Sequence, residues 1–298
     1  MPSVRALITG GQGFVGRHLE AMLRSEGDEV VAIDLETDVT DAYAVAAAVA
    51  AAAPDAIYHL AALSHVGDSW SDPGKVLSVN VIGTANVLAA ARQLDTVPST
   101  LFISSAEVYG IVAEQALPLS EAQPVAPASP YAASKAAAEQ VVLQASRGFG
   151  QRVIIARPFN HIGPGQAPSF AVSALAKRIV EATATGRSEL AVGTLTTRRD
   201  FTDVRDVVRS YRLLVEQGES GEIYNVCSGV DVSIAEVAEQ LMRLAGAELE
   251  LVTDPALVRP VDVPVLRGSA AKLEATTGWR PRISLAATLQ DVLDSFAE

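Results

Sequence analysis

The first 157 residues alternate short runs of branched apolar residues with longer helical stretches, and this order constrains the fold more than any other feature. Strands are predicted at Val4–Thr9, Glu29–Ile33, Ala56–Leu60, Thr100–Ser104 and Arg152–Ala156. Their continuous apolar character is typical of strands buried on both faces of a parallel sheet. Helices are predicted between them at Gly16–Glu26, Asp41–Ala53, Lys75–Gln93 and Tyr131–Gly148. The βαβα order predicts an α/β fold with a doubly wound parallel sheet of the Rossmann type.

Beyond Arg157 the pattern loosens, because proline and glycine interrupt it between positions 158 and 168. Later helices are predicted at Val172–Thr185, Val204–Glu216, Ile234–Ala245 and Leu285–Phe296, with strands at Ile223–Val226 and Glu248–Val252. We therefore expect one domain in residues 1–157, rejoined by segments near 200–227. A smaller, interleaved C-terminal α/β domain is expected over residues 158–298.

Charge and composition exclude several classes of protein. The chain has 23 basic and 35 acidic residues, and its net charge of −12 repels a phosphate backbone, so no nucleic-acid partner is expected. The longest apolar run, Ala42–Ala53, has 12 residues, fewer than the roughly 20 that a membrane helix needs. The N-terminus shows no signal peptide, and the single cysteine, Cys227, has no thiol partner. We expect a cytoplasmic protein without a membrane span, a disulfide or a metal.

A glycine-rich turn follows the first predicted strand. Residues 9–16 read TGGQGFVG, which spaces Gly10, Gly13 and Gly16 as GxxGxxG. Glycine lets the backbone approach a pyrophosphate, which then sits on the amides of a helix N-terminus. An ordinary glycine-rich turn is the alternative, but the strand before it and the helix after it favour a dinucleotide site that includes Phe14 and Val15.

Asp34 ends the second predicted strand, 18 residues after Gly16. A carboxylate at this place accepts hydrogen bonds from the adenosine ribose diol and repels a 2′-phosphate. A solvated loop acid is the alternative interpretation. The sequence therefore predicts that NAD(H) is favoured, while NADP(H) stays possible because Arg17 can offset the repulsion.

Tyr131 and Lys135 lie one helical turn apart, on the same face of a predicted helix. A tyrosine of pKa about 10 is a poor acid–base group at neutral pH, and we expect the ammonium and a nicotinamide cation to lower that pKa. Ser105 follows the strand Thr100–Ser104 at the carboxyl edge of the sheet, where this fold places its ligands. Ser105 can hydrogen-bond the substrate oxygen that Tyr131 protonates.

These motifs together resemble the extended short-chain dehydrogenase/reductase family, also called the nucleotide-sugar epimerase/dehydratase family. The resemblance covers nearly the whole chain and includes the segments Leu60–Ala62 and Asn80–Thr84. It implies a dinucleotide-binding first domain and a Ser–Tyr–Lys catalytic set. The cofactor residues that it implies, beyond the glycine loop and Asp34, are Asp38, Val39, Leu60, Ala61, Ala62, Asn80, Tyr131, Lys135 and Phe159.

The second half is similar to the GDP-4-keto-6-deoxy-mannose reductases within that family. The similar blocks are residues 157–166, 199–204, 224–229, 259–264 and 277–281. The resemblance implies that Asn160 faces the diphosphate, that Val172 and Lys177 line the base region, and that Arg199, Arg259 and Asp262 hold the nucleotide. Ser64, Ser105 and Glu107 complete the implied substrate set. A packed residue and a substrate contact stay open for His161.

Two reaction types fit these residues. Reduction of a C4 keto group needs a hydride and a proton from Tyr131, whereas 4,6-dehydration also needs a base and an acid beside the sugar. Glu107 follows Ala106 where glucose-nucleotide dehydratases place an Asp–Glu pair, but GDP-mannose dehydratases also keep only the glutamate. We expect a reductase that forms GDP-rhamnose or its C4 epimer, with a 4,6-dehydratase or 4-epimerase as the alternative. A redox-sensing or scaffolding protein is disfavoured because Tyr131 and Lys135 are both present.

A homodimer is also expected. The predicted helices that begin at Lys75 and Tyr131 resemble the pair that forms a four-helix dimer interface in this family. Five alanines between positions 132 and 138 would permit close approach of the helices, although small residues could equally pack inside one subunit.

Overall fold

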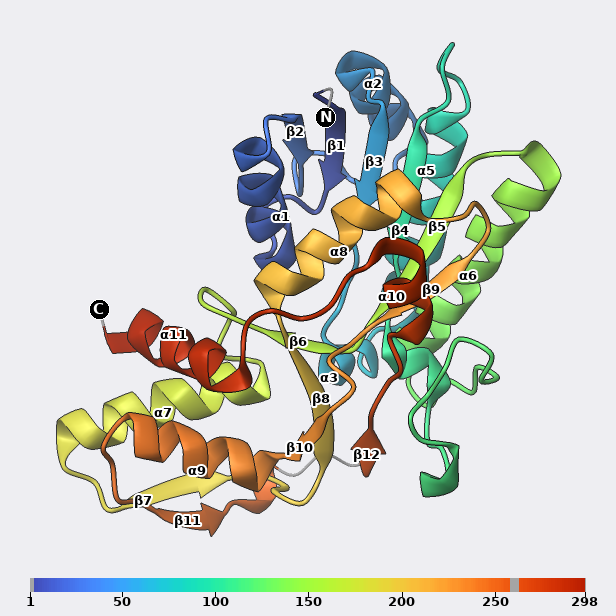
Figure 1. The fold of residues 1–298 in the computed structure, drawn as a ribbon. Coiled ribbons are helices and arrows are strands. Elements are labelled where there is room, and N and C mark those ends of the chain that lie inside the picture. The colour runs from blue at the N-terminus through green and yellow to red at the C-terminus, as the bar shows by residue number, and fades with distance from the viewer. Residues whose placement is uncertain (1–2, 258–262, 298) are drawn as a thin grey trace.

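The computed structural model describes residues 3–257 and 263–297. Two lobes stand one above the other, with the N-terminal segments in one and the helices α7, α9 and α11 in the other (Figure 1).

The larger lobe is built on a six-stranded sheet. Its strands are β1 (Arg5–Thr9), β2 (Glu29–Ile33), β3 (Ala56–His59), β4 (Ser99–Ile103), β5 (Val153–Pro158) and β9 (Ile223–Val226). They follow the order β2-β1-β3-β4-β5-β9, and every pair is parallel. The predicted doubly wound sheet is confirmed. The chain reverses its winding direction between β1 and β3, and at such a point the carboxyl ends of the strands open a crevice for a ligand.

Helices cover both faces of this sheet, which explains why β3 and β5 are buried along their whole length. On one face lie α1 (Phe14–Ser25) and α8 (Val204–Gln217), and on the other lie α2 (Ala42–Ala52), α5 (Gly83–Ala91) and α6 (Pro130–Phe149) (Figure 1). Ser129 caps α6 by accepting a hydrogen bond from the backbone N–H of Ala132, and Pro130 occupies the first turn.

The predicted helix Lys75–Gln93 is interrupted. The structure forms α4 (Pro73–Leu77), a π-helical turn (Ser78–Ile82) and then α5. By length and a mean hydropathy of 1.3, Pro73–Ala91 could cross a membrane, but the apolar core helix of a globular protein meets the same criterion. Its packing against α2 and α6 is that of such a core helix.

The smaller lobe holds the strands that the sequence predicted least well, whereas its three helices match their predicted bounds to within one residue. Its strands are β6 (Asn160–Ile162), β7 (Glu189–Val192), β8 (Arg198–Asp203), β10 (Asp231–Ser233), β11 (Glu250–Thr253) and β12 (Val265–Leu266). Its helices are α7 (Ala171–Thr185), α9 (Ile234–Leu244) and α11 (Leu285–Ala297). β8 is the central strand and pairs with β6, β10 and β12. Only β11 corresponds to a predicted strand, Glu248–Val252, and it begins two residues later.

The prediction missed β8 because its sequence, RRDFTD, is charged rather than apolar. The structure buries these charges with partners. The carboxylate of Asp200 accepts hydrogen bonds from the backbone N–H groups of Ser228, Gly229 and Gly268, at 2.8, 2.9 and 3.2 Å. A buried strand can therefore be polar where the surrounding loops supply donors.

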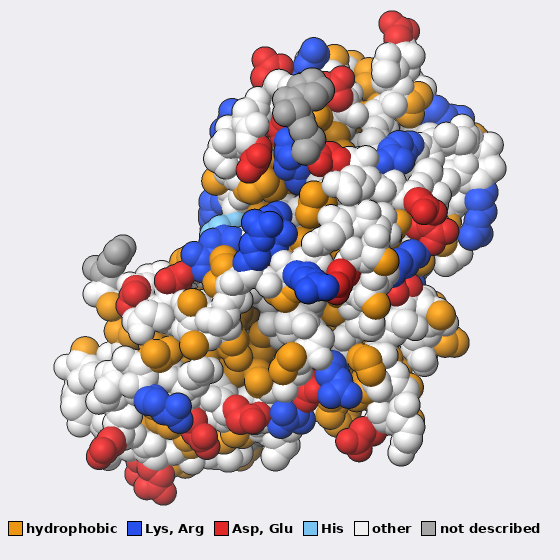
Figure 2. Space-filling model, viewed as in Figure 1, with side chains coloured by type: hydrophobic (Ala, Val, Ile, Leu, Met, Phe, Trp, Pro, Cys, Tyr) orange, Lys and Arg blue, Asp and Glu red, His pale blue; other side chains and the backbone are white. Residues whose placement is uncertain are grey.

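Helix α8 joins the lobes through its arginines. Arg212 pairs with Asp28 beside the large sheet at 3.1 Å, and Arg205 pairs with Asp291 on α11 at 2.6 Å. Basic side chains gather along the waist between the lobes, while acidic groups are scattered over both (Figure 2). The short helix α10 (Ala271–Thr277) returns to pack on α8 and β9, a return that the sequence analysis did not include.

Candidate active site

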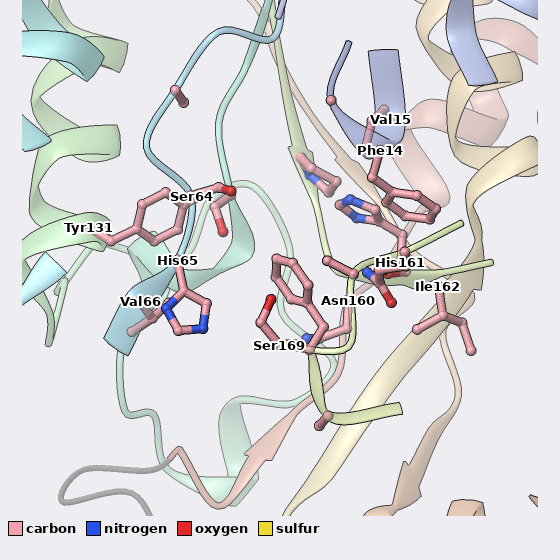
Figure 3. Close-up of a pocket in the computed structure, with 18 of the residues that line it drawn as sticks. Phe14, Val15, Ser64, His65, Val66, Tyr131, Asn160, His161, Ile162 and Ser169 are labelled. Atoms are coloured by element: carbon pink, nitrogen blue, oxygen red, sulfur yellow. The ribbon is translucent and has the colours of Figure 1, made fainter. Parts of the chain in front are cut away.

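A cavity of about 1430 Å³ lies between the lobes, at the carboxyl edge of the large sheet. Figure 3 shows Tyr131, Ser64 and His65 on one side of it, with Phe14, Asn160 and His161 on the other. The cavity therefore brings together residues from both halves of the chain.

The glycine turn forms one end of this cavity. Gly10 has a φ of +74°, and a Cβ at this position would lie 2.8 Å from the backbone nitrogen of Ala61. A Cβ at Gly16 would overlap the carbonyl oxygen of Gly10. Gly13 precedes α1 and offers no side-chain cap, so the first N–H groups of this 12-residue helix are not capped by it. The turn fits a dinucleotide pyrophosphate, because glycine keeps the backbone accessible and the helix dipole favours an anion.

Asp34 stands beside the same turn. Its carboxylate accepts hydrogen bonds from the backbone N–H groups of Gln12, at 2.8 Å, and Leu35, at 2.9 Å. These bonds hold the carboxylate against the glycine loop, and Asp34 lines the cavity with Arg17. The acid is therefore held at the cavity beside the glycine turn.

Of the other cofactor residues expected, Asp38, Val39, Leu60, Ala61, Ala62 and Phe159 also line the cavity. Asn80 does not. Its side chain is buried, donates to the hydroxyl of Ser134 at 2.8 Å and accepts from the backbone N–H of Leu63 at 2.9 Å. Asn80 ties the loop after β3 to α6, so it supports the wall from behind and does not form it.

Ser105 and Tyr131 meet at the centre of the cavity. Ser105 follows β4 and caps a short 3₁₀ turn, η2 (Ala106–Tyr109), while Tyr131 begins α6. Burial raises the pKa of Tyr131 to about 12; the hydrogen bond with Ser105 lowers it, and the charge of Glu107 raises it further. In the protein alone, removing the phenolate from water outweighs its polar neighbours, and the lowering expected with a nicotinamide cation stays a prediction.

Lys135 lies one turn further along α6 and is 3% exposed. Its ammonium donates to the carbonyl oxygen of Ile103 at 2.7 Å. Burial lowers the pKa of Lys135 to about 7, and the nearby Glu139 carboxylate opposes this shift. Burial therefore disfavours the charged form of Lys135, and the negative charge of Glu139 favours it.

The smaller lobe supplies the opposite wall. Asn160, Val172, Lys177 and Arg199 all line the cavity, as do Ser64 and Glu107 from the larger lobe. Arg199 is held by the carbonyl oxygens of Arg198 and Val263, at 2.9 and 2.7 Å. The side-chain oxygen of Asn160 is buried without a hydrogen-bond partner among the described residues, which suits a residue that meets a ligand. Arg259 and Asp262 lie outside the described residues.

Two histidines in the cavity make ring contacts that the sequence spacing could not indicate. His161 packs parallel to the Phe14 ring at 6.3 Å, and its Nδ1 contacts the carbonyl oxygen of Phe159 at 3.0 Å, so it is a packed residue that also lines the cavity. His65 meets Phe170 edge to face at 6.0 Å across the cavity. The sequence analysis missed His65 and Phe170, because the loops that carry them are remote in the chain. No cluster of His, Cys, Asp or Glu within residues 3–257 and 263–297 is arranged to hold a metal.

A Rossmann sheet whose glycine turn and Ser–Tyr–Lys set open into one cavity defines an extended short-chain dehydrogenase/reductase, an enzyme that works with a nicotinamide dinucleotide. Residues 34–292 match the family model described as GDP-mannose 4,6 dehydratase. The chain belongs to this family.

Named relatives share almost the whole length of the chain. GDP-6-deoxy-D-mannose reductase of Pseudomonas aeruginosa is 40% identical over 98% of this chain and 97% of that protein. GDP-6-deoxy-D-talose 4-dehydrogenase of Aggregatibacter actinomycetemcomitans is 30% identical over 91% of this chain and 90% of that protein. The solved structure of RMD from Pseudomonas aeruginosa complexed with NADPH superposes with a TM-score of 0.91 at 38% identity, covering 98% and 99% of the two chains.

Proposed function

We propose that this enzyme reduces the C4 keto group of a GDP-4-keto-6-deoxy-hexose with NAD(P)H, forming GDP-rhamnose or its C4 epimer. The observation that carries the proposal is the pair Tyr131 and Ser105. Both hydroxyls line the cavity and interact with each other, so the site offers a proton donor and a second hydrogen-bond donor at one point. The names of the two relatives support a GDP-linked 6-deoxy sugar as the substrate.

The proposed catalytic roles are supported by the shared cavity that Ser105, Tyr131 and Lys135 line. A bound nicotinamide dinucleotide supplies the hydride. Ser105 and Tyr131 present two hydroxyls to the C4 oxygen and stabilise the negative charge that develops there, and Tyr131 gives up its proton. Lys135, one turn from Tyr131, holds the cofactor ribose. We assign the cofactor to residues 1–157 with the returning segments near 200–227, and the sugar nucleotide mainly to residues 158–298.

Nucleotide contacts would come from the smaller lobe. The amide of Asn160 is proposed to meet the diphosphate, with Val172 and Lys177 at the base. Arg199 carries a permanent charge that suits phosphate, which an acidic protein must supply locally. Arg259 and Asp262 are proposed to complete this set.

Dehydration is the second candidate, because Glu107 lines the cavity and could act on the sugar. The two reactions differ in cofactor use, since a dehydratase restores its dinucleotide in each turnover and a reductase consumes it. The test offers the purified enzyme GDP-mannose with oxidised cofactor and, separately, its 4-keto-6-deoxy derivative with reduced cofactor. Consumption of cofactor with the keto sugar alone is expected. Formation of a keto sugar from GDP-mannose without net cofactor use would overturn the proposal.

A homodimer in the cytoplasm is proposed for the native state. The helix Pro73–Ala91 exposes Leu77 and Ile82 to 45% and 51%, and Trp70 and Phe149 beside it are 54% and 52% exposed. A second copy that packs α4–α5 and α6 against their equivalents would cover this apolar surface. Light scattering is expected to give twice the subunit mass of 31.1 kDa, and a particle of 31.1 kDa at micromolar concentration would exclude the dimer.

A further inference from the structure

A group of buried charges lies directly behind the catalytic residues. Glu139 is 1% exposed and stands one helical turn beyond Lys135 on α6. Its carboxylate accepts two hydrogen bonds from Arg157 on β5, at 2.8 and 2.6 Å, and one from the hydroxyl of Ser104 at 2.5 Å. Ser104 immediately precedes Ser105, so Glu139 contacts the loop that carries a catalytic hydroxyl.

Stability does not account for this arrangement. Burying an ion pair removes both charges from water, and apolar residues of similar volume often stabilise a fold equally well or better. Arg157 is nonetheless fixed from a second side, since its guanidinium lies 4.9 Å from the centre of the Tyr109 ring. The hydroxyl of Tyr109 in turn donates to Asn225 at 2.7 Å.

Glu139 lies one helical turn from Lys135 on α6, and its negative charge acts on the Lys135 ammonium without a direct ion pair between them among the described contacts. Lys135 is desolvated, and burial lowers its pKa to about 7 although Glu139 acts in the opposite direction. Buried neighbours on β3 and β5 include neutral His59, whose pKa burial lowers to about 3, and cationic Arg157. The titratable and charged groups around Lys135 include Tyr131 and Glu139 on α6, Glu107 and Tyr109 on η2, His59 on β3 and Arg157 on β5. Lys75 on α4 and Tyr211 on α8 line the same cavity.

We infer that Glu139 is a positioning residue that anchors the Ser104–Ser105 segment beneath the substrate and supplies the buried negative charge one helical turn from Lys135. The inference rests on the proposed function, in which the ammonium of Lys135 holds the cofactor beside Tyr131. Without the carboxylate, the Lys135 and Arg157 cations would share one buried region with no anion between them. Lys135 would then lose its proton, because Arg157 cannot.

The direct test measures the titration of Lys135. The chain has four lysines, Lys75, Lys135, Lys177 and Lys272, so carbon-13 labelling of the lysine side chains gives few NMR signals. The Lys135 signal is the one that disappears in Lys135→Met. In Glu139→Gln we expect its titration midpoint to fall by about one pH unit or more, the effect of losing a nearby opposite charge.

Two further variants separate charge from packing. Ser104→Ala removes a hydrogen bond and keeps both charges, so the midpoint is expected to stay near that of the wild type. Glu139→Gln/Arg157→Gln removes both charges. The Lys135 midpoint of this double variant should lie between those of Glu139→Gln and Ser104→Ala. This double variant also avoids an unpaired arginine should Glu139→Gln fail to fold. An unchanged midpoint in the folded variants that lack Glu139 would overturn the inference.

The kinetic readout is the pH profile of kcat/KM with the keto sugar. Glu139→Gln should lose activity at a lower pH than the wild type, by about the same pH interval as the NMR midpoint. A purely structural defect would lower kcat/KM equally at all pH values. If the wild type does not reduce the keto sugar, the proposed function fails, whereas the NMR midpoints still decide the role of Glu139.

Discussion

The two walls of the cavity are built in different ways. On the sheet side, Ser105, Tyr131 and Lys135 are 9%, 8% and 3% exposed, and packing and hydrogen bonds fix each of them. On the side of the smaller lobe, the side chain of Lys177 is 47% exposed and pairs with Glu181 at 3.8 Å. The first wall is set in place by the fold, whereas the second combines fixed groups such as Arg199, which is 8% exposed, with exposed ones such as Lys177.

This difference separates chemistry from recognition. Groups that act on a transition state gain from being fixed in advance, since no reorganisation is needed when charge develops. Groups that select a substrate can be mobile, because each contributes only a part of the binding free energy. We therefore expect substitutions in the sheet-side wall to lower kcat strongly, and those in the exposed part of the other wall to raise KM modestly.

Tyr131→Phe should have the largest effect. The variant keeps the ring in its buried place and removes the proton donor, so kcat should fall by a factor of about 10² to 10⁴. Steady-state rates with the keto sugar and reduced cofactor measure this, with cofactor binding by fluorescence as the control for folding. Near-normal turnover would remove Tyr131 from the role of acid and break the contrast between the walls.

Ser105→Ala tests the same wall with a smaller loss. The variant removes one hydrogen bond to the C4 oxygen but leaves the acid in place. The activation free energy should therefore rise by roughly 3 kcal/mol, the usual value for one such donor, and kcat/KM should fall about 10²-fold. The hydroxyl also lowers the pKa of Tyr131, so the variant should not become more active at high pH. A loss as large as that of Tyr131→Phe would mean that Ser105 does more than stabilise charge.

The larger lobe could be predicted from sequence because its signals are local. The strand at Glu29–Ile33 has the predicted bounds, and the glycine turn lies between β1 and α1 as expected. Strand β8 could not be predicted, since its burial depends on partners such as Ser228 and Gly268 that are remote in the chain. The π-helical turn at Ser78–Ile82 likewise left no mark on the apolar pattern.

The site shows the same division. Tyr131 and Lys135 were found from their spacing on one helix, and the structure places both at the cavity with Ser105. Burial raises the pKa of Tyr131 in the protein without cofactor, an effect that spacing could not indicate because the extent of burial is a property of the whole fold. Glu139 was passed over, since only the pairing of β5 beside β4 brings Arg157 and Ser104 together on it.

The choice between NADH and NADPH depends on Asp34, which lines the cavity beside the glycine turn, and its expected effect on kcat/KM is intermediate in size. The Asp34 carboxylate beside the glycine loop repels a 2′-phosphate, so kcat/KM with NADH should exceed that with NADPH by about tenfold, or about 1.4 kcal/mol. Asp34→Asn should narrow this ratio by removing the repulsion without adding a partner. A wild type that prefers NADPH, the cofactor in the solved structure of RMD, would show that Arg17 or another group outweighs Asp34.

Lys177→Ala should give the smallest change and sharpens the contrast most directly. The Lys177 side chain is 47% exposed, and an exposed pair such as Lys177–Glu181 is worth only about 0 to 1 kcal/mol, so the fold should melt at nearly the same temperature. A contact between this ammonium and the nucleotide base would be similarly screened by water, so KM should rise by no more than about fivefold while kcat stays unchanged. Asn160→Ala is the matched control from the same wall. The buried amide oxygen of Asn160 has no partner among the described residues, so its removal should raise KM more than Lys177→Ala does. A fall in kcat for Lys177→Ala would place this lysine with the fixed groups, and the division between the two walls would then be lost.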